Sequence, residues 1–363
     1  MAAYTTIDDP SAHFQIATWT GNTSAPRSIT NNGNSNLQPD WVWGKNRTTA
    51  GTDHEVYDSN RGTGTSYNLK TSSTVVEGTS TTYGQLTSFD TDGFTVNAGG
   101  SNDDLWNENG SEFVAWQWKC AGGTTSTNND GAVTSTVQVN STAGFSILTY
   151  TMNSNSNETV GHGLGVAPDI VITKARERGD SNGFWAVYTT LIDGSLDYLK
   201  LNELTAKANS SLSAPTSTVF TGAGSSTASY RSFVAYCFKS VQGYSKFGKY
   251  VGNGNSNGVF VYTGFAPAWV MIKDTSQATN WEIFDVKRNP GNVRNLKLGA
   301  NLSAAENGSD LGTTSQNNID ILSNGFKTRT GNTDTNVNGD TYIYMAFAEF
   351  PFVSSTGIPT TAR

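Results

Sequence analysis

The histidines and one polar run are the residues whose types could hold a metal ion or move a proton. His13, His54 and His162 are the three histidines, and none has a second histidine or a cysteine at the spacing of a zinc motif. The run NNDG at residues 128–131 resembles part of a calcium loop but lacks the distal glutamate of an EF-hand. Turns and ordinary half-buried roles explain these residues better than metal binding or catalysis.

Paired carboxylates could hydrolyse glycans if they met in one cleft. A glycoside hydrolase places its two carboxyl groups about 5 Å or about 9 Å apart, depending on its stereochemistry. Four aspartates gather in the sequence near a predicted turn, namely Asp90, Asp92, Asp103 and Asp104. Turn formation accounts for them, although carboxylates from distant loops could still meet. The sequence carries no recognisable catalytic motif, and a glycan-degrading enzyme stays open as the alternative function.

Two tryptophans beside short polar side chains could instead bind sugars without cleaving them. An aromatic face packs against a sugar ring while amides and carboxylates bond its hydroxyls. The two groups are Trp106 with Asn107 and Asp104, and Trp185 with Asn182 and Asp180. Loops on a rigid β framework are common places for such sites. The competing interpretation is that both tryptophans fill the cores of their domains.

The elements that would position these residues come from a phrase that the chain repeats three times. The copies are PDWVWGK at residues 39–45, PDIVITK at 168–174 and PAWVMIK at 267–273. In each copy a proline marks the entry of a strand, an apolar and β-branched run follows, and a lysine ends it. The phrase predicts three equivalent buried strands.

Further blocks recur around these strands in the same order. Each unit closes on an aromatic and alanine run, FVAW at 113–116, FVAY at 233–236 and YMAF at 344–347, which gives units at about 14–119, 145–239 and 247–352. A unit of roughly 100 residues can close a core of its own, unlike a short solenoid repeat. We expect one valine of each phrase in each core, flanked by an aromatic of the closing run: Val42 by Trp116, Val171 by Tyr236 and Val270 by Phe347.

Composition predicts the fold class. Only 15% of the residues are charged and 38 are glycine, against about 25% charged in ordinary domains. Few residues favour helices, so we predict an all-β chain of three tandem antiparallel β-sandwich domains, jelly-roll or lectin-like, related by the internal repeat. A short helix or an irregular loop is expected at 201–211 and at 300–309.

The predicted domain organisation follows from the repeat boundaries. It comprises an N-terminal arm at 1–13, β-sandwiches at 14–120, 144–240 and 245–353, a polar connector at 121–143 and a C-terminal tail at 354–363. The arm has few apolar residues, and we expect it to order on contact with a partner. A frayed or self-packed terminus is the other possibility. The long connector predicts more freedom for the first domain than for the other two.

Charge and cysteine usage exclude several function classes. The net charge is −7 and the pI near 5.0, which disfavours nucleic acid as a partner, because phosphate binding needs clustered lysine and arginine. No stretch approaches the roughly 20 apolar residues of a membrane span, and the first residues do not form a signal peptide. Cys120 and Cys237 occupy unequal places in their repeats, so we expect free thiols and no cofactor.

A family resemblance adds a functional expectation. The segments AYTTIDDP at 3–10, LQPDWVW at 37–43, SFDTDGF at 88–94, FVAW at 113–116 and YIYMAFAE at 342–349 carry it. They resemble repeat-containing virion structural proteins, fibre-like or decorating, of marine tailed bacteriophages. The resemblance implies a non-enzymatic protein of the virion, exposed as a tail-associated fibre or adhesion module or as a head decoration. Its implied partners are other virion proteins, in multiple copies or as a homo-oligomer, and a host surface glycan.

Overall fold

The chain folds around three large antiparallel sheets of the same strand order. The structure is a computed structural model that describes residues 3–78, 82–99, 105–153, 155–224, 232–311, 318–331 and 333–360. The first sheet has the order β1 (Phe14–Thr20), β8 (Glu112–Trp118), β3 (Trp41–Asn46), β4 (Glu55–Asp58) and β5 (Leu69–Lys70). The third has the same order in β19 (Ser245–Val251), β26 (Thr341–Pro351), β21 (Phe265–Asp274), β22 (Trp281–Asp285) and β23 (Leu298–Gly299).

The second large sheet keeps this order and extends it at both edges. Its equivalent strands are β11 (Phe145–Thr151), β18 (Ser232–Phe238), β13 (Ile170–Ala175), β14 (Ala186–Thr189) and β15 (Asp197–Lys200). Beyond β15 lies β16 (Ala208–Asn209), and beyond β11 lie β10 (Ser135–Asn140) and β9 (Ser126–Asn128). The polar connector at 121–143 therefore contributes two strands to this sheet.

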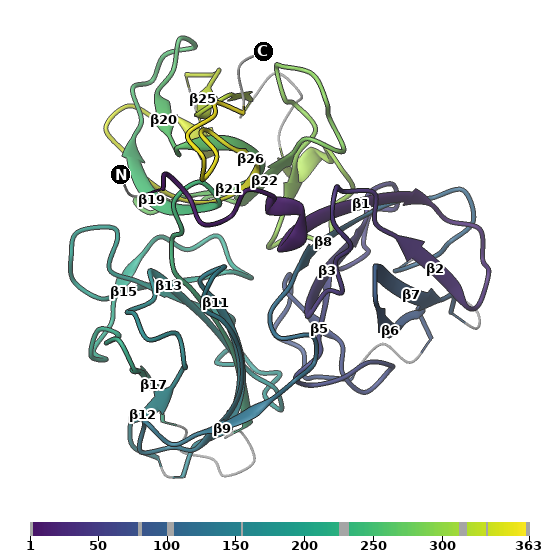
Figure 1. Cartoon of the computed structure of the whole chain (residues 1–363), viewed down its shortest axis with the longest axis vertical. Helices are drawn as coiled ribbons and strands as arrows, with labels where there is room; N and C mark the ends of the chain where they lie inside the picture. The colour runs from purple at the N-terminus through teal and green to yellow at the C-terminus, as the bar shows by residue number, and fades with distance from the viewer. Residues whose placement is uncertain are drawn as a thin grey trace.

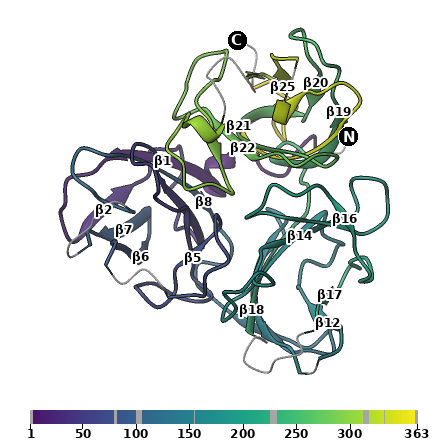
Figure 2. The ribbon, with the colours of Figure 1, turned by 180° about the vertical axis from the view of Figure 1, so that it is seen from behind.

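A small sheet accompanies each large one. The small sheets are β2 (Arg27–Thr30) with β7 (Gly93–Asn97) and β6 (Gln85–Asp90), β12 (Glu158–Gly161) with β17 (Val219–Gly222), and β20 (Phe260–Tyr262) with β25 (Gly325–Thr328) and β24 (Ile319–Leu322). Short 3-10 helices occur at η1 (Pro10–Ala12), η3 (Ser309–Leu311) and η4 (Thr333–Thr335). The all-β prediction is confirmed, and the two segments expected to hold a helix or a loop are mostly irregular. We call residues 14–119, 145–239 and 247–352 repeats 1, 2 and 3; they form three lobes around a common centre (Figures 1 and 2).

Each repeated phrase is buried on both faces of its strand. In β3, Val42 points into a cluster within repeat 1, whereas Trp41 and Trp43 point into a central cluster that all three repeats share. Successive side chains of a strand alternate between its two faces, so a strand covered on both sides reads as a continuous apolar run. Alternate residues of the phrase therefore fill two cores, the central cluster and the cluster within the repeat.

The central cluster joins equivalent aromatic rings from the three repeats. The ring of Phe347 lies 5.5 Å from that of Trp118 and 6.0 Å from that of Phe238, measured between centroids. These residues occupy one register position, because they pair with Trp269, Trp41 and Ile170 respectively. Each repeat keeps its own cluster, but the largest apolar core belongs to the whole chain. Repeat 1 contributes to this core as repeats 2 and 3 do, so the packing does not favour the greater freedom expected for it.

The strand register corrects the predicted flanks of the three valines. Val42, Val171 and Val270 are at most 1% exposed and lie in equivalent positions, as expected. Trp116, Tyr236 and Phe347 nevertheless face the central cluster on the opposite side of the sheet. Trp43 pairs with Trp116 and the equivalent Ile172 pairs with Tyr236. In repeat 3 the equivalent Met271 pairs with Met345, so the counterpart of Trp116 and Tyr236 is Met345 and not Phe347, two places later. A shift of two keeps every side chain on its face, so the apolar pattern alone cannot detect it.

The N-terminal segment packs onto the chain itself. Ile7 is 3% exposed and belongs to the central cluster. The hydroxyl of Tyr4 donates to the carbonyl of Gly264 at 2.8 Å, and that of Thr5 donates to the carbonyl of Gln242 at 2.8 Å. The described part of this segment thus packs as the self-packed alternative expects, and a partner-facing role for it stays a prediction.

Cys120 and Cys237 are buried free thiols. No helix in the described ranges is both long and apolar enough to cross a membrane.

Candidate functional site

The lysine that ends each repeated phrase is buried and forms hydrogen bonds between repeats. Lys45, Lys174 and Lys273 are at most 1% exposed, and each ammonium donates to main-chain carbonyls near it in the sequence. Each also reaches a carbonyl of another repeat: Ser303 for Lys45 at 3.5 Å, Thr74 for Lys174 at 3.3 Å and Leu204 for Lys273 at 3.0 Å. Repeat 1 thus contacts repeat 3, repeat 2 contacts repeat 1 and repeat 3 contacts repeat 2, which closes a ring.

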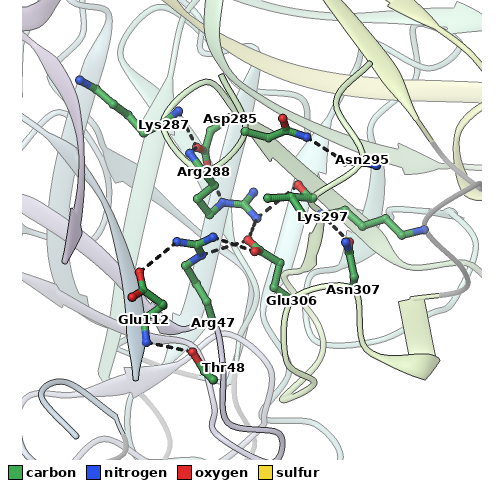
Figure 3. A network of polar contacts seen from close by, with 12 residues as sticks. Arg47, Thr48, Glu112, Asp285, Lys287, Arg288, Asn295, Lys297, Glu306 and Asn307 are labelled. Atoms are coloured by element: carbon green, nitrogen blue, oxygen red, sulfur yellow. Dashed lines mark hydrogen bonds and ion pairs between the residues drawn. The ribbon is translucent and has the colours of Figure 1, made fainter. Parts of the chain in front are cut away.

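A buried ion network forms where repeat 3 meets repeat 1 (Figure 3). Nε of Arg288 lies 2.5 Å from Oδ2 of Asp285, and its Nη1 lies 2.6 Å from Oε1 of Glu306. Arg47 of repeat 1 approaches Oε2 of the same Glu306 at 2.8 Å. Trp116 of repeat 1 adds a hydrogen bond from its indole nitrogen to Asp285 at 3.1 Å. Glu306 therefore bridges two arginines from two repeats.

The junction of repeats 1 and 2 repeats this network. Arg61 pairs with Asp58 at 2.6 Å and with Glu77 at 2.5 Å. Arg176 of repeat 2 pairs with the same Glu77 at 2.6 Å, and the hydroxyl of Tyr236 donates to Asp58 at 2.7 Å. The side chains of Arg61 and Asp58 are fully buried, so each charge depends on the other for its stabilisation.

The electrostatics of both networks keep the central arginines charged. Burial alone lowers the pKa of Arg288, but Asp285 and Glu306 outweigh it and raise that pKa above its usual value. The same balance, with Asp58, Tyr236 and Glu77 as the opposing groups, raises the pKa of Arg61. A guanidinium held in this way is a fixed cation whose donors are engaged by carboxylates. Its role is cohesion between repeats rather than proton transfer.

The junction of repeats 2 and 3 has a different chemistry. The positions equivalent to Asp58, Arg61, Glu77 and Arg176 hold Thr189, Ile192, Lys207 and Thr275. The amide of Lys207 still donates to the carbonyl of Thr275, as those of Glu77 and Glu306 donate to Arg176 and Arg47. The Lys207 side chain turns back to Asp193 and Asp197 of its own repeat. The backbone contact is thus shared by all three junctions, and the buried ion network by two.

His54 is a neutral structural histidine. Burial, with Lys45 and Arg288 nearby, lowers the pKa of His54 well below its usual value, against a hydrogen bond to the Gly299 backbone. Its Nδ1 accepts the indole N–H of Trp43 at 2.9 Å, so the ring carries its proton on Nε2. Trp185 and Trp281 hold the same position in the other repeats and donate to the carbonyls of Lys70 and Lys200. The sequence predicted an ordinary polar or half-buried histidine. His54 is instead completely buried, at the junction of repeats 1 and 3.

The residues predicted to contact glycans separate into buried and exposed ones. Trp106 is fully buried in the core of repeat 1, where its indole nitrogen donates to Glu55 at 2.6 Å. Asn107 is also fully buried, and Asp104 lies outside the described residues. Trp185 is fully buried in the central cluster. Neither tryptophan presents a ring face to a sugar, so the two rings take the core-filling alternative.

The second predicted group keeps its polar members at the surface. Asn182 and Asp180 are exposed, and Asp180 pairs with Arg178 at 2.7 Å. Both lie in the loop between β13 and β14. Among the residues that the structure describes, no group of three or more histidine, cysteine, aspartate and glutamate side chains is placed to hold a metal ion. The chemistry that the described residues offer most clearly is that of buried charge pairing.

Sequence reasoning missed these junction residues. The lysine was visible as the last residue of all three phrases, and a lysine retained after a buried apolar run is a signal for a buried ammonium with carbonyl partners. The ion networks offered a weaker signal. DSNR at 58–61 and DVKR at 285–288 place an aspartate three residues before an arginine, but repeat 2 lacks the pair.

Comparison with known proteins gives a family without an activity. A family model described as "Domain of unknown function (DUF7483)" matches residues 9–351. The match covers all three repeats and nearly the whole chain. No curated protein and no solved structure matches the chain.

Proposed function

We propose that this chain, which belongs to the DUF7483 family, is a non-enzymatic structural protein of a bacteriophage virion. It would be exposed on the particle as a tail-associated fibre or adhesion module or as a head decoration. Its partners would be other virion proteins, present in multiple copies, and a glycan of the host surface. The sequence resemblance to virion structural proteins motivates the proposal, and the geometry of the repeat junctions supports it.

The observation that carries the proposal is that the buried cationic side chains at the junctions hold the repeats together. The arginines and lysines at the junctions bond carboxylates and carbonyls of the chain itself, and they link one repeat to the next. Groups fixed in this way stiffen a multi-lobed unit but are not available to a substrate. A rigid, weakly charged module that works by shape and polar contact fits a particle surface.

The finer architecture forms part of the same proposal. Each repeat pairs a large sheet with a small one, and a separate apolar cluster lies within each repeat. We interpret each pair as a small β-sandwich whose large sheet also faces the common centre. Three sandwiches that share an inner core would be stiffer than three joined by linkers.

The proposal is tested on purified virions. Mass spectrometry of gradient-purified particles should detect the chain, and imaging of intact particles at chain-tracing resolution should place three lobes on the tail or the head. Absence of the chain from the particles would overturn the proposal. A second experiment tests the alternative of a glycan-degrading enzyme. The purified chain is incubated with host surface polysaccharide, and the release of new reducing ends would support that alternative.

A further inference from the structure

Among the residues that the structure describes, repeat 2 is open at a place where repeats 1 and 3 are filled. Strand β14 carries Ala186 where β4 carries Glu55 and β22 carries Glu282, as their pairing with Thr173, Gly44 and Ile272 shows. Glu55 and Glu282 are at most 1% exposed. Glu55 accepts from Trp106 at 2.6 Å, and Glu282 lies 4.0 Å from the buried ammonium of Lys297. Repeat 2 has a methyl group in place of these long side chains.

A hollow of about 470 Å³ occupies this position in repeat 2. Phe184, Ala186 and Tyr188 line it on the side of the large sheet, and Arg178 and Asn182 line its rim. Tyr188 is half-buried, whereas Tyr57 and Phe284 at the equivalent positions are completely buried. The size falls within the range of about 300–1,000 Å³ that is usual for ligand pockets.

Phe184 and Tyr188 are aromatic side chains that line the hollow. Tyr198 lies outside the lining but beside both: it forms a cross-strand pair with Tyr188, with ring centroids 6.1 Å apart, and stacks with Phe184 at 6.2 Å. All three residues are only half-buried. Half-buried aromatic side chains beside a hollow are a common feature of sites that bind small, partly apolar molecules.

The charges near the hollow are already compensated. Arg178 pairs with Asp180 at 2.7 Å at the rim. Lys200 lies 4.6 Å from the centre of the Phe184 ring and pairs with Glu203 at 3.0 Å. An anionic ligand would have to displace these carboxylates, whereas a neutral ligand can hydrogen-bond to the Asn182 amide and to the Arg178–Asp180 pair while that pair stays intact.

We propose that this hollow in repeat 2 binds a neutral saccharide. A pyranose has an apolar C–H face that packs against the rings of Phe184 and Tyr188, and hydroxyl groups that bond Asn182 and the Arg178–Asp180 pair. The inference rests on the proposed function, in which the chain contacts a host surface glycan. It adds where the glycan binds, the hollow in repeat 2, and its class, a neutral saccharide. It also relocates the expected glycan contact: Asn182 and Asp180 stay part of it, and half-buried rings replace the buried tryptophan.

Saturation-transfer NMR on the full chain tests the proposal with the methyl pyranosides of glucose, galactose, mannose and N-acetylglucosamine as probes. Methyl glucuronide serves as the anionic comparison. We expect at least one neutral pyranoside to bind. Ala186→Phe should abolish binding because the new ring fills the hollow, and Phe184→Ala should weaken it about three- to tenfold, the loss of one aromatic contact. The matched control is Phe260→Ala, at a 45% exposed phenylalanine of repeat 3, which should bind as the unaltered chain does.

The outcomes separate cleanly. Binding of no neutral pyranoside, binding of the glucuronide alone, or equal binding by a folded Ala186→Phe variant would overturn the proposal. If Ala186→Phe does not fold, Phe184→Ala and Asn182→Ala decide, and unchanged affinity in both overturns it. Detection of the chain in virions without sugar binding rejects this site alone, and sugar binding by a chain absent from virions rejects the proposed function alone.

Discussion

The hydroxyl of Tyr236 in repeat 2 donates to Oδ2 of Asp58 in repeat 1 at 2.7 Å, with both residues fully buried. Trp116 occupies the position of Tyr236 one repeat earlier and donates to Asp285 in the same manner. Two different aromatic side chains thus place a donor at the edge of the central core, because each combines an apolar body with a polar tip. In repeat 3 the position holds Met345, and the position of the carboxylate in repeat 2 holds Thr189. Donor and carboxylate are therefore present together at two junctions and absent together at the third.

Removing the hydroxyl of Tyr236 should destabilise the chain. Tyr236→Phe keeps the ring in the core but takes one hydrogen bond from a buried carboxylate, at a cost of about 1.5–3 kcal/mol in the free energy of unfolding. Urea denaturation followed by tryptophan fluorescence measures it. Tyr83→Phe, at a 37% exposed tyrosine, is the matched control and should change that free energy by less than about 0.5 kcal/mol. Equal stability of the two variants would show that the bond contributes nothing.

The central arginine of each ion network should matter far more than a surface arginine. Arg288→Met leaves Asp285 and Glu306 buried with one cation fewer, and breaking such a pair costs about 3–5 kcal/mol. Arg329→Met provides the control, since Arg329 is 38% exposed and its pair with Asp320 spans 3.3 Å. A pair in which one partner is this exposed contributes about 0–1 kcal/mol. Thermal and chemical unfolding of both variants should differ accordingly, and similar losses would argue against a cohesive role for the network.

The sequence predicted where the strands lie better than it predicted which residues pack against them. The three phrases identified β3, β13 and the middle of β21, because an apolar run is a local signal. The proline precedes β3 and β13 as predicted, but Pro267 lies within β21 beside a register shift, so its expected place at a strand entry is wrong. The side-chain period of two hid the offset of Met345, since a shift of two residues preserves every face. The central cluster was missed for another reason: an alternating run shows that both faces are buried but not that one face meets two other repeats. Trp185 is buried by the same packing between repeats, whereas Trp106 is buried within the core of repeat 1 itself. Asn182 and Asp180 lie in the exposed loop between β13 and β14.

The three core valines should respond alike to truncation. Val42→Ala, Val171→Ala and Val270→Ala each remove two methyl groups from a fully packed position, and we expect each to lose on the order of 1–3 kcal/mol by extension from larger truncations. Val251→Ala, at a 53% exposed valine, is the control. Differential scanning calorimetry would reveal the difference. A melting temperature unchanged by any of the three core substitutions would mean that its position is not tightly packed.

The packed N-terminal segment should contribute to stability. Ile7→Ala removes most of a side chain that is 3% exposed in the central cluster, which costs about 2–5 kcal/mol for an isoleucine. Ile358→Ala offers a matched control at 64% exposure. Guanidinium unfolding of the two variants gives the comparison. If Ile7→Ala proves as stable as Ile358→Ala, the segment is not held in the core in solution and the role as a partner-facing arm regains support.

The buried lysines should make the chain more stable in mildly alkaline solution. Burial lowers the pKa of Lys174 to about 7 and that of Lys273 to about 8, whereas an unfolded lysine titrates near 10.4. Between about pH 7 and pH 10 the unfolded chain therefore binds more protons, so the free energy of unfolding rises with pH across this window. Above about pH 10 the gain ends, because burial raises the pKa of tyrosines such as Tyr150 and their unfolded counterparts ionise. Urea titrations from pH 6.5 to pH 10 measure the slope. Lys174→Met should flatten it and Lys287→Met, at an exposed lysine, should not; a stability that is flat or falls from pH 7 to pH 9.5 would mean that carbonyl bonding keeps both ammonium groups charged.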